Sequence, residues 1–130
     1  KKAQALASSK QILFLPYTDT PFSYINNAKY ICLTSKYEGF PMVLVESLSL
    51  GTPVVSLDII SGPSEIIKHQ KNGLLISKRE VPLFSEALKR MFDDEELFQQ
   101  CKMQAEKSVE KFSMENISIK WNQLLQDELQ

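Results

Sequence analysis

The chain has 130 residues, which is the length of one ordinary domain. Hydrophobic residues make up 43% of it and charged residues 24%, so the chain can bury a core. The formal net charge of −1 provides no basic field, and we expect no nucleic-acid partner. No apolar run approaches the ~20 residues that a membrane span needs.

The two cysteines are expected to be small core residues. Cys32 lies in the apolar run "YICLT", and Cys101 lies on a helical pattern. Neither a disulfide nor a metal site is indicated by this pair. A reducing, cytoplasmic setting fits this cysteine usage.

Four short apolar runs predict strands. The first covers residues 11–15 and ends at Pro16, and the others lie in "YICLTS", "TPVVSLD" and "KNGLLIS". Their hydrophobicity is nearly continuous, which is typical of strands that are buried on both faces of a parallel sheet. Such strands require helices on both sides of the sheet.

Helical patterns separate and follow these strands. A short helix is predicted after Pro21, a second over residues 41–50 with Gly51 as its end, and a third after Pro63. Three further helices follow Ser77. The last carries an apolar face that is either core or a domain contact, formed by Ile117, Trp121, Leu124 and Leu125. The whole pattern predicts a doubly wound, Rossmann-like α/β fold with about four parallel strands and a helical C-terminus.

Ligands of such sheets bind where the strands end and the helices begin. The predicted loops at this edge are residues 16–20, 35–40, 58–62 and 77–81. The second and the third of these loops hold unusual polar and glycine residues, in "SKYEGF" and "DIISG". They are therefore the first candidates for a binding site.

The segment "YEGFPMVLVESLSLG" has the features of a phosphate site. Gly39 lets a ligand approach the backbone, and the first amides of the following helix lack internal partners. With the helix dipole they favour an anion. Because Pro41 has no N–H, Met42 and Val43 are the expected donors.

Two carboxylates bracket this helix start, Glu38 before it and Glu46 within it. An ionised carboxylate only accepts hydrogen bonds and suits a pair of hydroxyls. A ligand with hydroxyls on both sides of a diphosphate is a nucleotide sugar. The alternative interpretations are that Glu46 belongs to an exposed helix stripe and that Glu38 is an ordinary loop charge.

In order along the chain, "SKYEGFPMVLVESLSLGTPVVSLDIISGPSEII" and "NGLLI" resemble the donor-binding half of the retaining group 1 glycosyltransferases, which have the GT-B fold. The signature of that family is a Glu, seven residues and a second Glu, usually with Gly-Phe-Gly after the first Glu. A "GxPVV" segment and a Gly-x-x-Glu turn follow it. The resemblance extends from about residue 11 to residue 125.

The resemblance implies a role for each residue of the candidate site. Glu38 would act on the donor sugar as the catalytic residue, and Glu46 would bind the ribose hydroxyls. Main-chain groups would line the diphosphate, from Gly39, Phe40, Met42 and Val43. The nucleotide base would lie near Leu15, Pro16 and Tyr17. Pro41 departs from the family pattern, since it stands where a second Gly is usual.

The resemblance also implies that residues 1–130 are a single partial domain of a longer transferase. The N-terminal acceptor domain and a Gly-Arg…Lys stretch of the family are not found here, so the chain alone is expected to be inactive. The parent enzyme would move a hexosyl unit, from UDP-sugar most readily, to a saccharide or lipid-linked acceptor in glycan biosynthesis. No cofactor or metal is implied. The expected location is cytoplasmic, with peripheral association of the parent at the inner face of the membrane.

Two other classes remain open on the residues. One is a non-catalytic α/β domain that binds a nucleotide or a protein, and the other is a GT-B relative such as an epimerase or phosphorylase. The single histidine, His69, is expected to be solvated and not catalytic. Neither the sugar nor the acceptor can be read from the residues.

Overall fold

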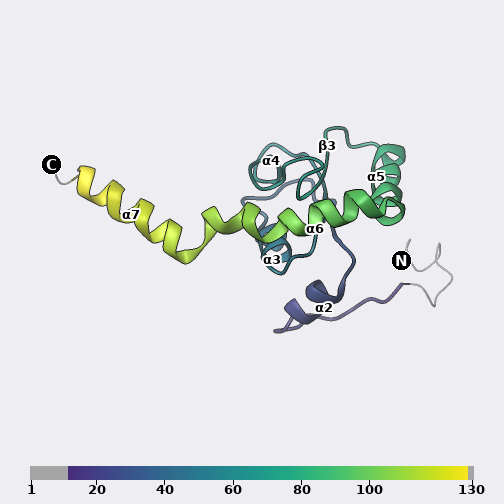
Figure 1. The fold of residues 1–130 in the computed structure, drawn as a ribbon, viewed down its shortest axis with the longest axis horizontal. Coiled ribbons are helices and arrows are strands. Elements are labelled where there is room, and N and C mark those ends of the chain that lie inside the picture. Colours follow the sequence, from purple (N-terminus) through teal and green to yellow (C-terminus); the bar gives the residue numbers. More distant parts are fainter. Residues whose placement is uncertain (1–11, 129–130) are drawn as a thin grey trace.

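The computed structural model describes residues 12–128. Helices and strands alternate in its first part, and helices fill the last third of the chain (Figure 1). The elements follow one another as α2 (Phe22–Asn27), β1 (Ile31–Leu33), α3 (Met42–Ser49), β2 (Val54–Leu57), α4 (Pro63–Ile66), β3 (Gly73–Ile76), α5 (Val81–Asp93), α6 (Glu95–Val109), the 3-10 helix η1 (Glu110–Phe112) and α7 (Met114–Glu128).

The three strands form one parallel sheet in the order β1-β2-β3. Val54 of β2 stands opposite Ile31 of β1 and opposite Gly73 of β3, so the strands start in register. All four residues of β2 are buried, which agrees with the continuous hydrophobicity of its sequence.

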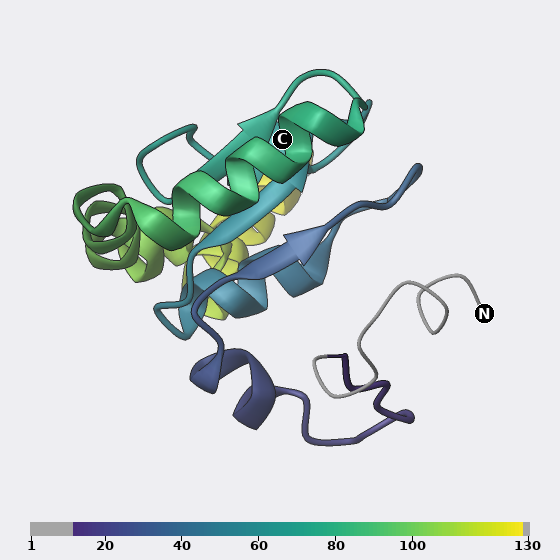
Figure 2. The ribbon, with the colours of Figure 1, turned by 90° about the vertical axis from the view of Figure 1, so that its right-hand side faces the viewer.

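Helices cover both faces of the sheet, as a doubly wound fold requires. Figure 2 shows α5 in front of the strands and α3 behind them. Val54 packs in the cluster on the α3 side, while its neighbour Val55 packs in the cluster on the α5 side. α6 contributes to both clusters, because Leu97 and Cys101 join the α5 side and Ala105 joins the α3 side. The predicted architecture is confirmed.

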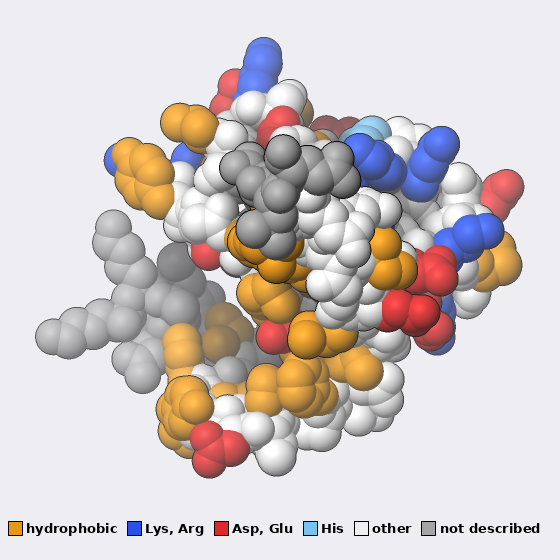
Figure 3. Space-filling model, turned by 90° about the vertical axis from the view of Figure 1, so that its left-hand side faces the viewer, with side chains coloured by type: hydrophobic (Ala, Val, Ile, Leu, Met, Phe, Trp, Pro, Cys, Tyr) orange, Lys and Arg blue, Asp and Glu red, His pale blue; other side chains and the backbone are white. Residues whose placement is uncertain are grey.

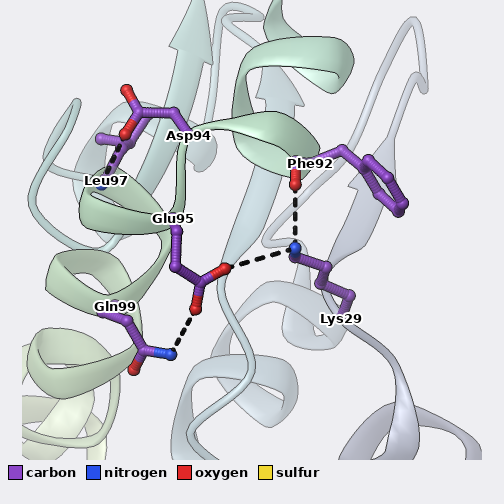
Figure 4. Close-up of polar contacts among 6 residues, drawn as sticks. All are labelled: Lys29, Phe92, Asp94, Glu95, Leu97 and Gln99. Carbon is purple, nitrogen blue, oxygen red and sulfur yellow. Dashed lines mark hydrogen bonds and ion pairs between the residues drawn. The ribbon is translucent and has the colours of Figure 1, made fainter.

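Lys29 ties the entry of β1 to the junction between α5 and α6 (Figure 4). Its ammonium donates to the carbonyl of Phe92 at 2.8 Å and lies 3.7 Å from the carboxylate of Glu95. It also lies 4.8 Å from the ring centroids of Phe92 and Phe98. A cation at the end of α5 complements the helix dipole. These contacts connect β1 to the α5–α6 junction at the amino-terminal edge of the sheet.

One predicted strand is wrong. Residue 11 lies outside the described residues, and residues 12–15 form no strand and are exposed. A β-strand needs a neighbour for its backbone groups, and none of the strands in the described range pairs with this segment. Three parallel strands are therefore described, where about four were predicted.

The terminal helix has the predicted position in the chain but does not lie in the core. α7 projects from the rest of the molecule (Figure 1), and the Trp121 side chain is 59% exposed.

On the face that Figure 3 shows, hydrophobic side chains gather in the lower part, where α2 lies. α2 exposes the aromatic rings of Phe22 and Tyr24. No helix among residues 12–128 is long and apolar enough to span a membrane.

Gly73 is the tightest position of the sheet and gives a test of the fold. A Cβ at this position would lie 2.3 Å from the Val54 carbonyl oxygen and 2.8 Å from its Cγ2 atom. We predict that Gly73→Ala lowers the free energy of unfolding by about 1–3 kcal/mol, the usual cost of overpacking. Denaturant unfolding followed by circular dichroism measures the change.

Gly39→Ala is the matched control, because a Cβ at Gly39 would meet no atom within 4 Å. The denaturant concentration at the unfolding midpoint of Gly39→Ala should stay close to that of the unchanged protein. Equal stability of the two variants would show that β3 does not approach β2 as closely as described.

Candidate functional site

The loops that follow β1 and β2 touch each other at the carboxyl edge of the sheet. The Ser61 hydroxyl donates to the Glu38 carbonyl oxygen at 2.7 Å. One residue further on, Gly62 packs against the ring of Pro41, and both residues are buried. The second and third loops predicted from the sequence are thus brought together.

The start of α3 contains a tight turn at Pro41. The proline has φ −77° and ψ 80°, close to an inverse γ-turn, and the Met42 amide donates to the Phe40 carbonyl at 2.8 Å. The Leu44 amide donates to the Pro41 carbonyl at 2.9 Å. Within residues 12–128 the Val43 amide has no hydrogen-bond acceptor. Of the two amides predicted to face an anion, Val43 is therefore open and Met42 is engaged.

Glu38 and Glu46 are half-buried on either side of this helix start. In the described part of the chain neither carboxylate forms an ion pair or a side-chain hydrogen bond. The carboxylate of Glu95, by contrast, accepts from Gln99 at 2.8 Å and lies near Lys29. A partly buried carboxylate has reduced access to water, so an unpaired one is ready to accept hydrogen bonds from a ligand.

The loop has a further contact that the sequence did not reveal. The Phe40 ring meets the Phe112 ring edge-on, with centroids 5.3 Å apart. Next to Phe112, the Lys111 ammonium donates to the Glu65 carbonyl in α4 at 2.9 Å. Phe40 and Phe112 are 72 positions apart, and Glu65 and Lys111 are 46 positions apart. Contacts at such separations leave no periodic pattern in the sequence, so only the structure shows that η1 supports the site.

The structure does not bring the predicted base-binding residues to this site. Leu15, Pro16 and Tyr17 are exposed in the segment before α2, and Tyr17 is 91% exposed. Figure 2 shows this segment standing away from the carboxyl ends of the strands. Because residues 12–15 form no strand, their loop is not placed at the sheet edge. The role of these three residues stays a prediction.

The fourth predicted loop borders a separate hollow on the α5 side. Its cavity has a volume of about 310 Å³, and the ends of β1 and β2 contribute Thr34 and Leu57. The loop contributes Arg79 and Glu80. This hollow does not include either carboxylate of the candidate site.

Other reactive groups lie away from the site. Cys101 is a buried free thiol, as predicted, and burial raises its pKa to about 11. Cys32 is also a free thiol but is exposed, so the prediction that it is a core residue is wrong. His69 is exposed, as predicted, and its Nδ1 accepts from the Leu75 amide at 3.1 Å. Among the described residues no cluster of His, Cys, Asp and Glu could hold a metal ion.

The fold defines a Rossmann-like α/β protein, and its candidate site lies at the carboxyl edge of a parallel sheet, where such folds bind ligands. Residues 1–108 match the family model of glycosyl transferases group 1. The chain belongs to this family, which confirms the resemblance seen in its motifs.

Relatives and solved structures agree with this assignment. The poly(ribitol-phosphate) alpha-N-acetylglucosaminyltransferase of Staphylococcus aureus is 31% identical over 113 residues, which are 86% of this chain and 23% of the relative. One similar solved structure is a mutant of TarM from S. aureus in complex with fondaparinux, alpha-GlcNAc-glycerol and UDP. It has a TM-score of 0.75 and 32% identity, and the match covers 83% of this chain and 22% of the TarM chain.

The apo form of the lipopolysaccharide outer core galactosyltransferase WaaB has a TM-score of 0.84 and 26% identity. The match covers 98% of this chain and 37% of WaaB. The chain therefore spans well under half the length of the relatives that it matches. Several of these relatives are named as glycosyltransferases that act on cell-surface glycans, such as poly(ribitol-phosphate) and lipopolysaccharide.

Proposed function

We propose that this chain forms the part of a retaining glycosyltransferase that binds the nucleotide diphosphate sugar. The observation that carries the proposal is the pair of half-buried carboxylates, Glu38 and Glu46, which have no partner among residues 12–128 and lie on either side of a helix start. Carboxylates suit hydroxyl groups, and the amides between them suit phosphate. The order of these groups matches a sugar, a diphosphate and a ribose.

The proposed division of roles follows the direction of the chain. Glu38 accepts from hydroxyls of the donor sugar and acts in catalysis, and Glu46 binds the ribose. The diphosphate lies against the backbone of Gly39 and Phe40 and accepts from the Val43 amide. The Met42 amide can donate to the diphosphate only if its hydrogen bond to the Phe40 carbonyl opens. Leu15, Pro16 and Tyr17 would approach the base only if their segment moves.

UDP is the proposed nucleotide, since one similar protein, TarM, has been crystallised with UDP. The relatives' names include acceptors as different as poly(ribitol-phosphate) and the lipopolysaccharide core. We propose that the parent transfers a hexosyl unit to a saccharide or lipid-linked acceptor of this kind, with retention of the anomeric configuration. No metal or cofactor takes part in the proposed binding.

Glu46 provides the first test. Glu46→Gln keeps the size of the side chain but removes its charge, so it should weaken the binding of UDP by about 10- to 100-fold. This corresponds to ~1.5–3 kcal/mol for hydrogen bonds to a charged group. Calorimetric titration of the full-length protein with UDP, GDP and ADP measures the change and identifies the nucleotide.

Glu86→Gln is the matched control, because Glu86 is exposed on α5 and lies away from the proposed site. The affinity of the Glu86→Gln variant for UDP should equal that of the unchanged protein. If the full-length protein bound none of the three nucleotides at millimolar concentration, the proposed donor site would be rejected, and a non-catalytic interaction domain would explain the chain better.

Glu38 provides the second test. Because this residue is assigned to the sugar end, Glu38→Ala should lower the turnover of the full-length enzyme more than its affinity for the nucleoside diphosphate. Steady-state rates with the donor sugar and calorimetry with UDP separate the two effects. Equal losses of turnover and affinity would show that the roles of the two carboxylates are assigned wrongly.

A further inference from the structure

We infer that Ser61 is a positioning residue for the donor, which acts by fixing the peptide between Glu38 and Gly39. This inference rests on the donor site proposed above and names a residue outside its motif. Ser61 lies 23 positions after Glu38, in the loop that follows the neighbouring strand. Its hydroxyl donates to the Glu38 carbonyl oxygen at 2.7 Å in a partly buried position.

The hydrogen bond determines the direction of the next amide. In a trans peptide the carbonyl of one residue and the N–H of the next point in opposite directions. The Glu38 carbonyl points toward Ser61, so the Gly39 N–H points away from the Ser61 loop. That amide has no acceptor within residues 12–128, and a Cβ at Gly39 would meet no atom within 4 Å. An open amide with a set direction is available for the donor.

A second contact holds the two loops at a constant separation. Gly62 has φ +98°, a conformation that favours glycine, and a Cβ there would lie 2.3 Å from Cδ and 3.1 Å from Cγ of Pro41. The ring of Pro41 thus fills the space that Gly62 leaves. This explains how the loop accommodates Pro41 in place of the second Gly that is usual in the resembling family. The contact keeps Ser61 beside the Glu38 carbonyl.

The hydrogen bond is tested first without a ligand. In Ser61→Ala the Glu38–Gly39 peptide loses its fixed partner, so the amide resonance of Gly39 should shift and its hydrogen exchange should become faster. Ser61→Thr retains the hydroxyl and should restore both. Ser64→Ala is the control, because Ser64 is exposed and its side chain makes no hydrogen bond within the described residues. An unchanged Gly39 resonance in Ser61→Ala would overturn the inference.

The functional part is tested in the full-length enzyme by kinetics. Ser61→Ala should lower kcat/KM for the donor sugar by about 2- to 12-fold, as expected for one lost hydrogen bond. UDP affinity should fall by a similar factor, because UDP and the donor sugar share the diphosphate that the Gly39 amide would face. Ser61→Thr should recover most of the rate and of the affinity. Thermal stability should stay close to that of the unchanged protein, whereas a purely structural role would lower it together with the rate. If Ser61→Ala fails to fold, Ser61→Cys, a weaker donor, should give an intermediate rate, and unchanged kinetics in it would overturn the inference.

A second comparison separates Ser61 from the Glu38 side chain. Glu38→Ala keeps the backbone carbonyl that accepts from Ser61, so the Gly39 amide should respond to Ser61→Ala as strongly in a Glu38→Ala background as in the unchanged protein. Loss of that response would overturn the inference. If the unchanged protein bound no nucleotide, the proposed function would fail, while the Gly39 measurement would still decide whether Ser61 fixes the peptide.

Discussion

The parallel pairing of β2 with its two neighbours is the constraint on which the site depends. β2 is buried along its whole length, and consecutive residues, Val54 and Val55, pack into the cores on opposite faces. Both cores therefore depend on the central position of β2 in the sheet. Since all three strands run in the same direction, their carboxyl ends meet at one edge, where the loops after β1 and β2 become neighbours. The contact between Ser61 and Glu38 is a consequence of that pairing.

Pro41 links the sheet to the start of α3 in two ways. Its ring is buried against Gly62, and its backbone forms the turn that engages the Met42 amide. A proline provides no N–H, so the turn leaves the Val43 amide as the open donor of the first helical residues. The packing of the proline and the direction of the anion site are therefore set by the same residue. On its other side the loop is supported by the Phe40–Phe112 contact.

Most elements of the fold could be predicted because hydrophobic spacing is a local property. Residues 41–50 were predicted as a helix, and α3 covers Met42–Ser49. Residues 11–15 show the limit of this reasoning, since a hydrophobic run becomes a strand only beside a partner. Trp121 shows the same limit, because it is exposed although it lies on an apolar helix face. Such a face indicates that the helix packs against a partner, but it does not identify that partner.

The candidate site was predictable in part for the same reason. The two carboxylates and the glycine lie within nine residues, so their spacing can be read in one motif. The support from Ser61 and Phe112 comes from elsewhere in the chain and follows only from the packing of loops. The engaged Met42 amide could not be foreseen either, because it depends on the ψ angle at Pro41.

The charges around the site explain why the direction of its amides matters. Glu38, Glu46 and Asp58 are acidic, and Lys36 is the one cation in the two loops that meet here. A helix start contributes the equivalent of only about half a positive charge. A diphosphate would therefore gain little from net attraction to these residues, and like charges nearby would oppose it. Its binding would rest on hydrogen bonds from the open amides of Gly39 and Val43. A neutral serine that fixes one of these peptides would therefore influence the site without changing its charge.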